Sequence, residues 1–144
     1  MKIAWDDSLV VGVAEIDDQH RRIFDNFNAF SDACSEGHGA EKLNELFWFL
    51  GSYIAIHFAE EERLMQKVGF PDYPNHHRLH SAFTNQVDVL MERFIENGPS
   101  REIAGTVGET IRNWLIEHIS QTDCSIGRFI REQRQDHVKL DRLG

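Results

Sequence analysis

The sequence has few cysteines, few prolines and no long apolar run, and each shortage excludes a class of protein. Its two cysteines, Cys34 and Cys124, stand far apart without a CxxC motif. This excludes a disulfide framework and a thiolate zinc site, and we expect both to be reduced thiols. The longest stretch without formal charge, Leu46 to Ala59, is shorter than the roughly 20 residues of a membrane helix. We therefore predict no insertion into a membrane.

Basic residues are scarce relative to acidic ones. Lysine and arginine number 15 against 24 aspartates and glutamates, a formal net charge of −9 with neutral histidine. This charge has the wrong sign for binding phosphate backbones, so nucleic acid is not an expected partner. The N-terminus, Met1 to Asp7, meets acidic residues before any apolar stretch. We see no signal peptide there and expect a cytoplasmic protein.

The length is that of about one ordinary domain, and we predict a single domain over residues 1–144. With 41% hydrophobic and 27% charged residues, and without repeats or a Gly/Ser linker, the composition is typical of a folded protein. Stretches containing glycine or proline divide the chain into segments of helical length. These segments run over about residues 16–34, 41–68, 75–97 and onward from about 101.

Apolar residues in these segments recur at alternating spacings of three and four, which places them on one face of a helix. In the second segment the spacing places Tyr53 and Leu64 on the buried face. Asp17 and Ser100 are expected as N-caps of the first and fourth helices, since short polar side chains can accept a hydrogen bond from a free backbone N–H.

Four amphipathic helices joined by short connections predict an all-α fold, an antiparallel up-down-up-down four-helix bundle. The bundle is expected over about residues 17–122. Residues 1–15, which include the Val10-Val11-Gly12-Val13 run, are expected to form an extended arm over it. Residues 124–144 are expected to add a short, polar helical tail.

Polar residues break this pattern at positions where the helices require core residues. These positions hold His20, His57, Glu61, His76, His80 and His118. Burying so many imidazoles and a carboxylate without partners would cost several kcal/mol per group. Converging histidine and glutamate side chains are typical ligands of a metal, so the cluster predicts a metal site.

The spacing of these residues sharpens the prediction. His57 and Glu61 are four apart, as are His76 and His80, so each pair projects from adjacent turns of one helix face. His118 and Asp123 are five apart, so the helix must loosen or end for Asp123 to join. One tetrahedral zinc would leave histidines over, whereas carboxylates can bridge two metals within a bundle, which favours a dinuclear site.

Several motifs in this order resemble those of the hemerythrin family, and the length is similar to that of a single-domain prokaryotic hemerythrin. The resemblance runs from Trp5 to Asp123 and rests on Val11-Gly12-Val13, Ile16-Asp17-Asp18-Gln19-His20, His57-Phe58-Ala59-Glu60-Glu61-Glu62, His76 with His80, and Trp114-Leu115-Ile116-Glu117-His118 with Asp123. It implies a non-haem di-iron centre with a bridging oxo or hydroxo group. In it, His76, His80 and His118 bind one iron, His20 and His57 bind the other, and Glu61 and Asp123 bridge them.

The family resemblance also implies a function, which is the reversible binding of dioxygen for transport, storage or delivery. One coordination position stays vacant on the iron held by two histidines, and dioxygen would bind there as hydroperoxide. We expect an apolar lining of the vacant side by Ile23, Phe58, Trp114 and Leu115. No catalytic residue is assigned, and we predict a monomeric, non-enzymatic oxygen binder that could serve an oxygen-using enzyme partner.

Two other functions fit the same residues. The first is a di-iron enzyme that reduces dioxygen, peroxide or nitric oxide. Such enzymes tend to be richer in carboxylates than this set of five histidines and two carboxylates. The second is an oxygen or redox sensor that acts on a partner.

Glu60 and Glu62 are expected as solvated surface carboxylates on other helix faces, and His77 as a solvated histidine.

Overall fold

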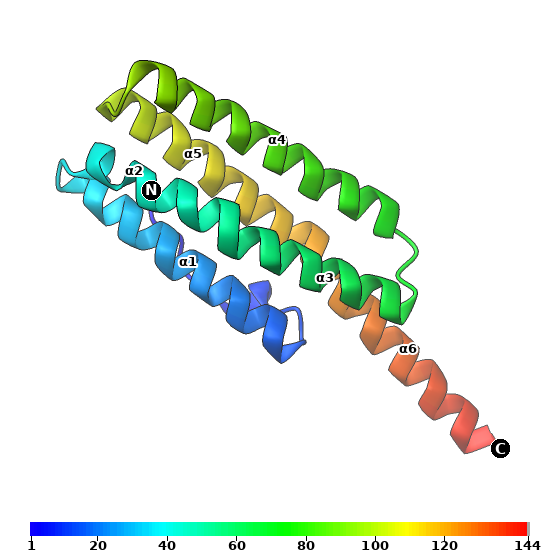
Figure 1. The fold of residues 1–144 in the computed structure, drawn as a ribbon. Helices are drawn as coiled ribbons and strands as arrows, with labels where there is room; N and C mark the ends of the chain where they lie inside the picture. The colour runs from blue at the N-terminus through cyan, green and yellow to red at the C-terminus, as the bar shows by residue number, and fades with distance from the viewer. Residues whose placement is uncertain (144) are drawn as a thin grey trace.

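Four antiparallel helical columns make up the fold, which confirms the predicted all-α bundle (Figure 1). The computed structural model describes the backbone of residues 1–143 and the side chains of residues 1–136. Two of the columns contain a π-helical turn. In chain order the helices are α1 (Ala14–Ser35), α2 (Gly39–Phe49) continued by the π turn η2 (Leu50–Ile54) into α3 (Ala55–Val68), α4 (Tyr73–Asn97), and α5 (Arg101–Glu117) continued by the π turn η3 (His118–Asp123) into α6 (Cys124–Leu143).

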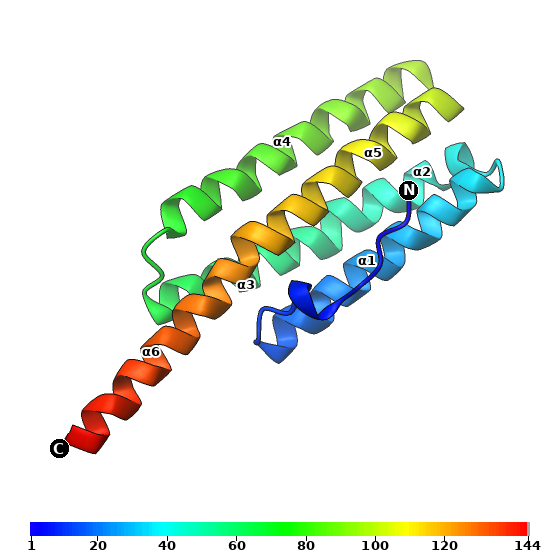
Figure 2. The same ribbon diagram turned by 180° about the vertical axis from the view of Figure 1, so that it is seen from behind.

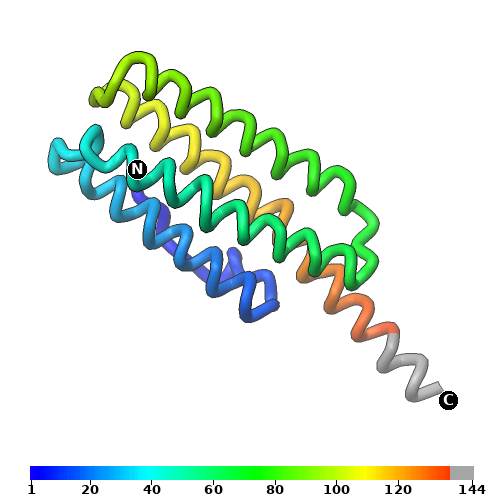
Figure 3. The backbone as a smooth tube through the Cα atoms, viewed as in Figure 1, coloured from blue at the N-terminus to red at the C-terminus, as the bar shows by residue number. Residues whose placement is uncertain are grey.

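The two ends of the chain lie outside the four columns, as the sequence predicts. The N-terminal arm contains one 3-10 turn, η1 (Asp7–Leu9), and runs along α1 (Figure 2). The backbone N–H of Ile3 donates to the side chain of Asn28 at 2.8 Å, and the Asn28 amide donates back to the Ile3 carbonyl at 2.8 Å. In its coloured part in Figure 3, helix α6 continues the line of α5 and η3 and runs beside the α3–α4 connection. Within residues 1–143, no helix has both the length and the apolar character needed to cross a bilayer.

Of the two predicted N-caps, one is confirmed and one is wrong. Ser100 precedes α5 and its hydroxyl accepts a hydrogen bond from the Ile103 N–H at 3.1 Å. Asp17 lies inside α1, which begins at Ala14. Its carboxylate instead accepts the backbone N–H groups of Val11 at 2.7 Å and Gly12 at 3.1 Å. The unpaired amides of the arm compete for this carboxylate, so Asp17 anchors the arm rather than starting the helix.

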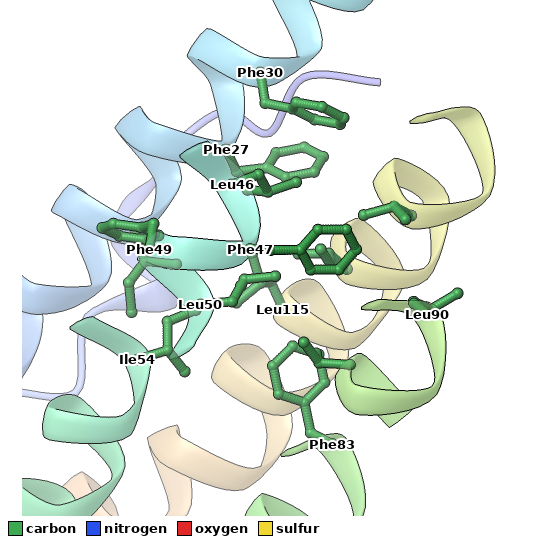
Figure 4. Close-up of a cluster of buried hydrophobic side chains, with 14 of the residues drawn as sticks. Phe27, Phe30, Leu46, Phe47, Phe49, Leu50, Ile54, Phe83, Leu90 and Leu115 are labelled. Atoms are coloured by element: carbon green, nitrogen blue, oxygen red, sulfur yellow. The ribbon is translucent and has the colours of Figure 1, made fainter. Parts of the chain in front are cut away.

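The hydrophobic core fills the space between α1, α2, α4 and α5 (Figure 4). It consists mainly of phenylalanine and leucine side chains, among them Phe27, Phe30, Leu46, Phe47 and Leu90. Three core residues stand one helical turn from histidines of the polar cluster, namely Ile54 before His57, Phe83 after His80, and Leu115 before His118. The apolar core therefore continues directly into the polar cluster along the bundle axis.

The π turn η2 changes which residues of the second column are buried. Tyr53 and Leu64 are half-buried, and Ile54 and Met65, at 2% and 0% exposure, occupy the core, so the prediction for this face was wrong by one residue. Successive steps of four residues overshoot an α-helical turn of 3.6 residues. The wider π turn compensates for this drift.

Both cysteines are free thiols in the structure. Cys34 packs against Gly39, where an added Cβ would lie 2.4 Å from its sulfur. Cys124 lies under the arm, with its sulfur 3.6 Å from the Ser8 carbonyl. Burial raises the pKa of both thiols, which keeps them protonated and lowers their reactivity.

Candidate metal centre

All four columns contribute to one buried polar cluster. Its members are His20 from α1, His57 and Glu61 from α3, His76 and His80 from α4, and His118 and Asp123 from η3. None of these side chains is more than 4% exposed. The structure thus brings together all seven residues that the sequence proposes as ligands.

The seven residues form two overlapping groups. In the first group, ligand atoms of Glu61, Asp123 and three histidines, His76, His80 and His118, lie within 4.8 Å of one another. In the second group the same holds for Glu61, Asp123 and two histidines, His20 and His57. Each group could hold one metal ion. The two carboxylates belong to both groups, which is the arrangement expected of bridging ligands.

The two oxygens of Glu61 face different groups of histidines. Its Oε1 lies 2.7 Å from Nε2 of His76 and 3.3 Å from Nε2 of His80. Its Oε2 lies 3.3 Å from Nε2 of His57 and 3.5 Å from Nε2 of His20. One carboxylate can therefore offer one oxygen to each of two metal ions.

The two oxygens of Asp123 also face different groups of histidines. Its Oδ1 lies 2.9 Å from Nε2 of His76 and 3.0 Å from Nε2 of His118, and its Oδ2 lies 3.0 Å from Nε2 of His20. Residues five apart point in different directions on an α-helix, but η3 is a π turn, in which hydrogen bonds link residues five apart. The predicted loosening of this helix is confirmed, and it is what turns Asp123 toward the cluster.

The histidines direct ring nitrogens toward one another. Nε2 of His20 lies 3.2 Å from Nε2 of His57, and Nε2 of His80 lies 3.1 Å from Nε2 of His118. In each pair at most one proton can be shared, since two protonated nitrogens would repel. Converging imidazole nitrogens are instead well satisfied by a metal ion between them.

The carboxylates are also poorly satisfied by protein groups alone. Within the described residues, Oε2 of Glu61 and both oxygens of Asp123 are buried without a hydrogen bond of good geometry. Buried anionic oxygens without such bonds are costly unless a cation neutralises them. The donor set of imidazoles and carboxylates with free lone pairs therefore fits two divalent ions of the first transition row.

The electrostatics of the metal-free cluster show what a metal would replace. Burial opposes protonation of His20 and His76, but the nearby carboxylates of Asp123 and Glu61 outweigh it and raise the pKa of each histidine to about 9. Burial lowers the pKa of His80. The histidines keep the pKa of both carboxyls below their ordinary values against the effect of burial. Protons thus balance the buried negative charge, and metal ions would displace them.

A small, narrow cavity borders His20 and His57 of the second group and His118 of the first. Its volume is about 10 Å³, at the lower limit of the roughly 10–15 Å³ that one water molecule needs. Its walls are mostly apolar. They comprise the four residues proposed from the sequence, Ile23, Phe58, Trp114 and Leu115, together with Ile54, Ile119, His20, His57, His118 and Asp123. Ile54 and Ile119 were missed, although each lies within three residues of a histidine of the cluster.

Aromatic rings pack against the group with three histidines. Phe58 stacks on His80 with ring centroids 3.8 Å apart, and Trp114 stacks on His118 at 4.2 Å. Phe83 also stacks on Trp114, at 3.9 Å. These contacts limit the rotation of the rings.

The contacts of three polar residues next to the cluster, Gln19, Glu60 and Glu62, were not recognised from the sequence. Nδ1 of His57 donates to the side-chain oxygen of Gln19 at 2.6 Å, and the Gln19 amide donates to Glu60. Glu62 contacts the exposed His77 and lies 3.6 Å from Nδ1 of His80. The expectation of solvated carboxylates was therefore wrong, since Glu60 and Glu62 are half-buried and engaged. These contacts join different helices, so no periodicity within one helix could have predicted them.

Fold and site together define a class, that of four-helix bundles with a buried metal-binding cluster of histidines and carboxylates. The model of the hemerythrin HHE cation binding domain matches residues 11–130. The chain belongs to the hemerythrin family. It is 31% identical to a bacteriohemerythrin of Methylococcus capsulatus over 111 residues, 77% of this chain and 82% of that protein. It is 28% identical to a bacteriohemerythrin of Pseudomonas paraeruginosa over 95% of this chain and 87% of that protein.

A solved structure agrees with this assignment. The crystal structure of a hemerythrin mutant superposes with a TM-score of 0.70 at 25% identity, covering 88% of this chain and 95% of that one. The hemerythrin-like fold therefore extends over most of the chain, including all four columns.

Proposed function

We propose that this protein binds dioxygen reversibly at a di-iron centre held by the seven clustered residues. His76, His80 and His118 would hold one iron, and His20 and His57 the other. Glu61 and Asp123 would bridge the two irons alongside an oxo or hydroxo group. The observation that carries the proposal is the unequal division of histidines around shared carboxylates, with an apolar cavity on the side that has fewer ligands.

The chemistry of the centre follows from its ligands. Two ferrous ions would supply two electrons to dioxygen and recover them on its release. Five neutral imidazoles with two carboxylates give less negative charge than the carboxylate-rich sites of di-iron oxidases. This ligand set therefore favours binding of dioxygen over its further activation.

The cavity marks the apolar side of the centre, and we place the dioxygen on this side. Ile23, Ile54, Leu115 and Ile119 form walls that offer no hydrogen bond. Water gains little by entering such a space, whereas dioxygen needs no hydrogen-bonding wall. Exclusion of water would also slow the loss of bound oxygen as hydroperoxide, since this loss needs a proton donor.

The test is the visible absorption spectrum of the iron-loaded, anaerobically reduced protein before oxygen, after oxygen, and after oxygen is removed. We expect two irons per chain and a visible band that appears with oxygen and disappears reversibly without added reductant. A band that is absent, or that decays at once to a stable oxidised spectrum, would favour an enzyme or a sensor instead. Steady consumption of reductant would identify the enzyme.

A further inference from the structure

A chain of two hydrogen bonds connects His57 with a carboxylate near the surface. Nδ1 of His57 donates to Oε1 of Gln19 at 2.6 Å, and Nε2 of Gln19 donates to Oε2 of Glu60. We propose that Gln19, held in one orientation by Glu60, is a positioning residue that fixes the ring of His57 for metal binding. This inference rests on the proposed function only in requiring that the cluster holds metal.

The chemistry of the three groups gives the chain one direction. An ionised glutamate can only accept hydrogen bonds, so Glu60 selects the NH₂ group of Gln19. The carbonyl oxygen of Gln19 must then face His57, and because a carbonyl only accepts, Nδ1 of His57 must carry the proton. This leaves Nε2 of His57 with its lone pair free toward Glu61 and His20. If the Gln19 amide were flipped, both contacts would become repulsive.

This arrangement distinguishes His57 from other histidines of the cluster. Within the described residues, Nδ1 of His20, His76 and His80 is buried and lacks a hydrogen-bond partner. A hydrogen bond at the remote nitrogen fixes the tautomer of a histidine ligand and raises its basicity. Among these four histidines, only His57 therefore has a hydrogen bond at Nδ1, since Glu62 stays 3.6 Å from Nδ1 of His80. His57 also belongs to the group beside the apolar cavity.

The chain also ties together the two helices that hold this group. Gln19 directly precedes His20 on α1, while Glu60 lies three residues after His57 on α3. The two hydrogen bonds therefore connect α1 to α3 beside the place where Nε2 of His20 and His57 approach to 3.2 Å. Gln19 and Glu60 are both half-buried, so water competes only partly for these bonds.

The experiment compares Gln19→Leu, Glu60→Leu and Glu60→Gln with the parent protein under anaerobic conditions. The readouts are ferrous iron affinity, by competition with a chromogenic chelator, and the midpoint potential of the iron-loaded protein. We expect Gln19→Leu to lower the affinity of one iron by about 10–100-fold, the usual effect of removing a hydrogen-bond partner of a metal ligand. The midpoint potential of the iron-loaded Gln19→Leu variant should rise, because a less basic His57 stabilises the oxidised metal less.

The Glu60 variants separate orientation from charge. We expect Glu60→Leu to change affinity and potential in the same direction as Gln19→Leu, by a smaller factor. Glu60→Gln should restore most of the parent values, since its amide oxygen still accepts from Gln19. Asp18→Leu is the matched control: Asp18 precedes Gln19, its side chain is 78% exposed, and its ion pair is with Arg21. It should leave both readouts unchanged.

The inference is overturned if Gln19→Leu keeps the parent affinity and potential within twofold, or if Asp18→Leu shifts them equally. Thermal unfolding of the metal-free variants checks the fold, and if Gln19→Leu does not fold, the Glu60→Leu and Glu60→Gln pair decides. Zinc-loaded protein gives an independent readout, a downfield NMR signal of the His57 Nδ1 proton that Gln19→Leu should move upfield. Because no readout uses oxygen, a protein that binds iron but not dioxygen would refute the proposed function alone.

Discussion

The two halves of the candidate centre share their carboxylates but differ in the number of histidines and in how those histidines are packed. The half with His76, His80 and His118 has three imidazoles, two of them stacked against Phe58 and Trp114. The half with His20 and His57 has two imidazoles beside an apolar cavity. If the proposed function holds, a ligand would bind on the second half, where the protein supplies fewer histidines.

The largest expected effect comes from removing what the halves share. Glu61→Ala deletes a buried carboxylate that faces four histidines. We expect at least one iron per chain to be lost, measured by metal analysis after anaerobic loading. Glu92→Ala, an exposed carboxylate on α4, is the control and should retain the parent iron content. Full iron content in Glu61→Ala would contradict the bridging role.

Removing one histidine from each half tests whether the halves differ in function. His57→Leu should abolish the reversible oxygen band and weaken only one metal site, because the three-histidine group stays complete. His80→Leu should weaken the opposite site. Iron stoichiometry and the oxygen spectrum of both variants check this. Equal losses at both sites in both variants would show that the centre assembles as one unit and not as two separable halves.

The pH dependence of the metal-free protein tests the electrostatics of both halves, since His20 and His76 belong to different groups. Each has its pKa raised from 6.5 to about 9 in the folded state. Their stabilisation is fully present below about pH 6.5 and is lost as pH rises through about 9. The pKa of His80 is lowered, so its protonation disfavours the folded state, and only below about pH 6.5.

We therefore expect the free energy of unfolding of the metal-free protein to fall between pH 6.5 and 9, by an amount on the order of a few kcal/mol. Denaturant titrations at several pH values measure it. Iron-loaded protein, in which metal has replaced the protons, should change much less over the same range. Parallel pH profiles for the two forms would contradict this account of the cluster.

Filling the cavity should affect oxygen binding more than metal binding. Ile119→Phe adds volume to the cavity wall, so we expect weaker oxygen binding with unchanged iron content. Overpacking costs about 1–3 kcal/mol of stability. Ile111→Phe, at a core position with 1% exposure that does not line the cavity, is the matched control for that cost. Spectral titration measures the oxygen affinity of both variants. Equal affinities would show that the cavity has no role in oxygen binding.

The smallest effect is expected far from either half. Ser100→Ala removes the side-chain cap of α5 and should lower stability by about 1 kcal/mol. Thermal unfolding measures this loss. Because α5 remains packed in the bundle, the iron content and oxygen spectrum should be unchanged. A change in either would show that the cap of α5 affects the metal centre.

Prediction from the sequence worked where one helix decides the outcome. The spacing of His57 with Glu61, and of His76 with His80, fixes each pair on one helix face regardless of the rest of the fold. It failed where neighbouring segments compete. Asp17 anchors the arm instead of starting α1. Ile54, at the end of the π turn η2, and Met65 occupy the core in place of Tyr53 and Leu64.

The sequence by itself therefore determined the helical columns, their polar inner positions and the residue types of a metal site. Only the tertiary structure decided which oxygen of Glu61 and Asp123 faces which histidines, where the cavity lies, and that Gln19 reaches His57. Periodicity is a property of one helix and is written in its residues. Contacts between helices depend on how whole columns pack, and each π turn changes that packing by a rotation no local pattern specifies.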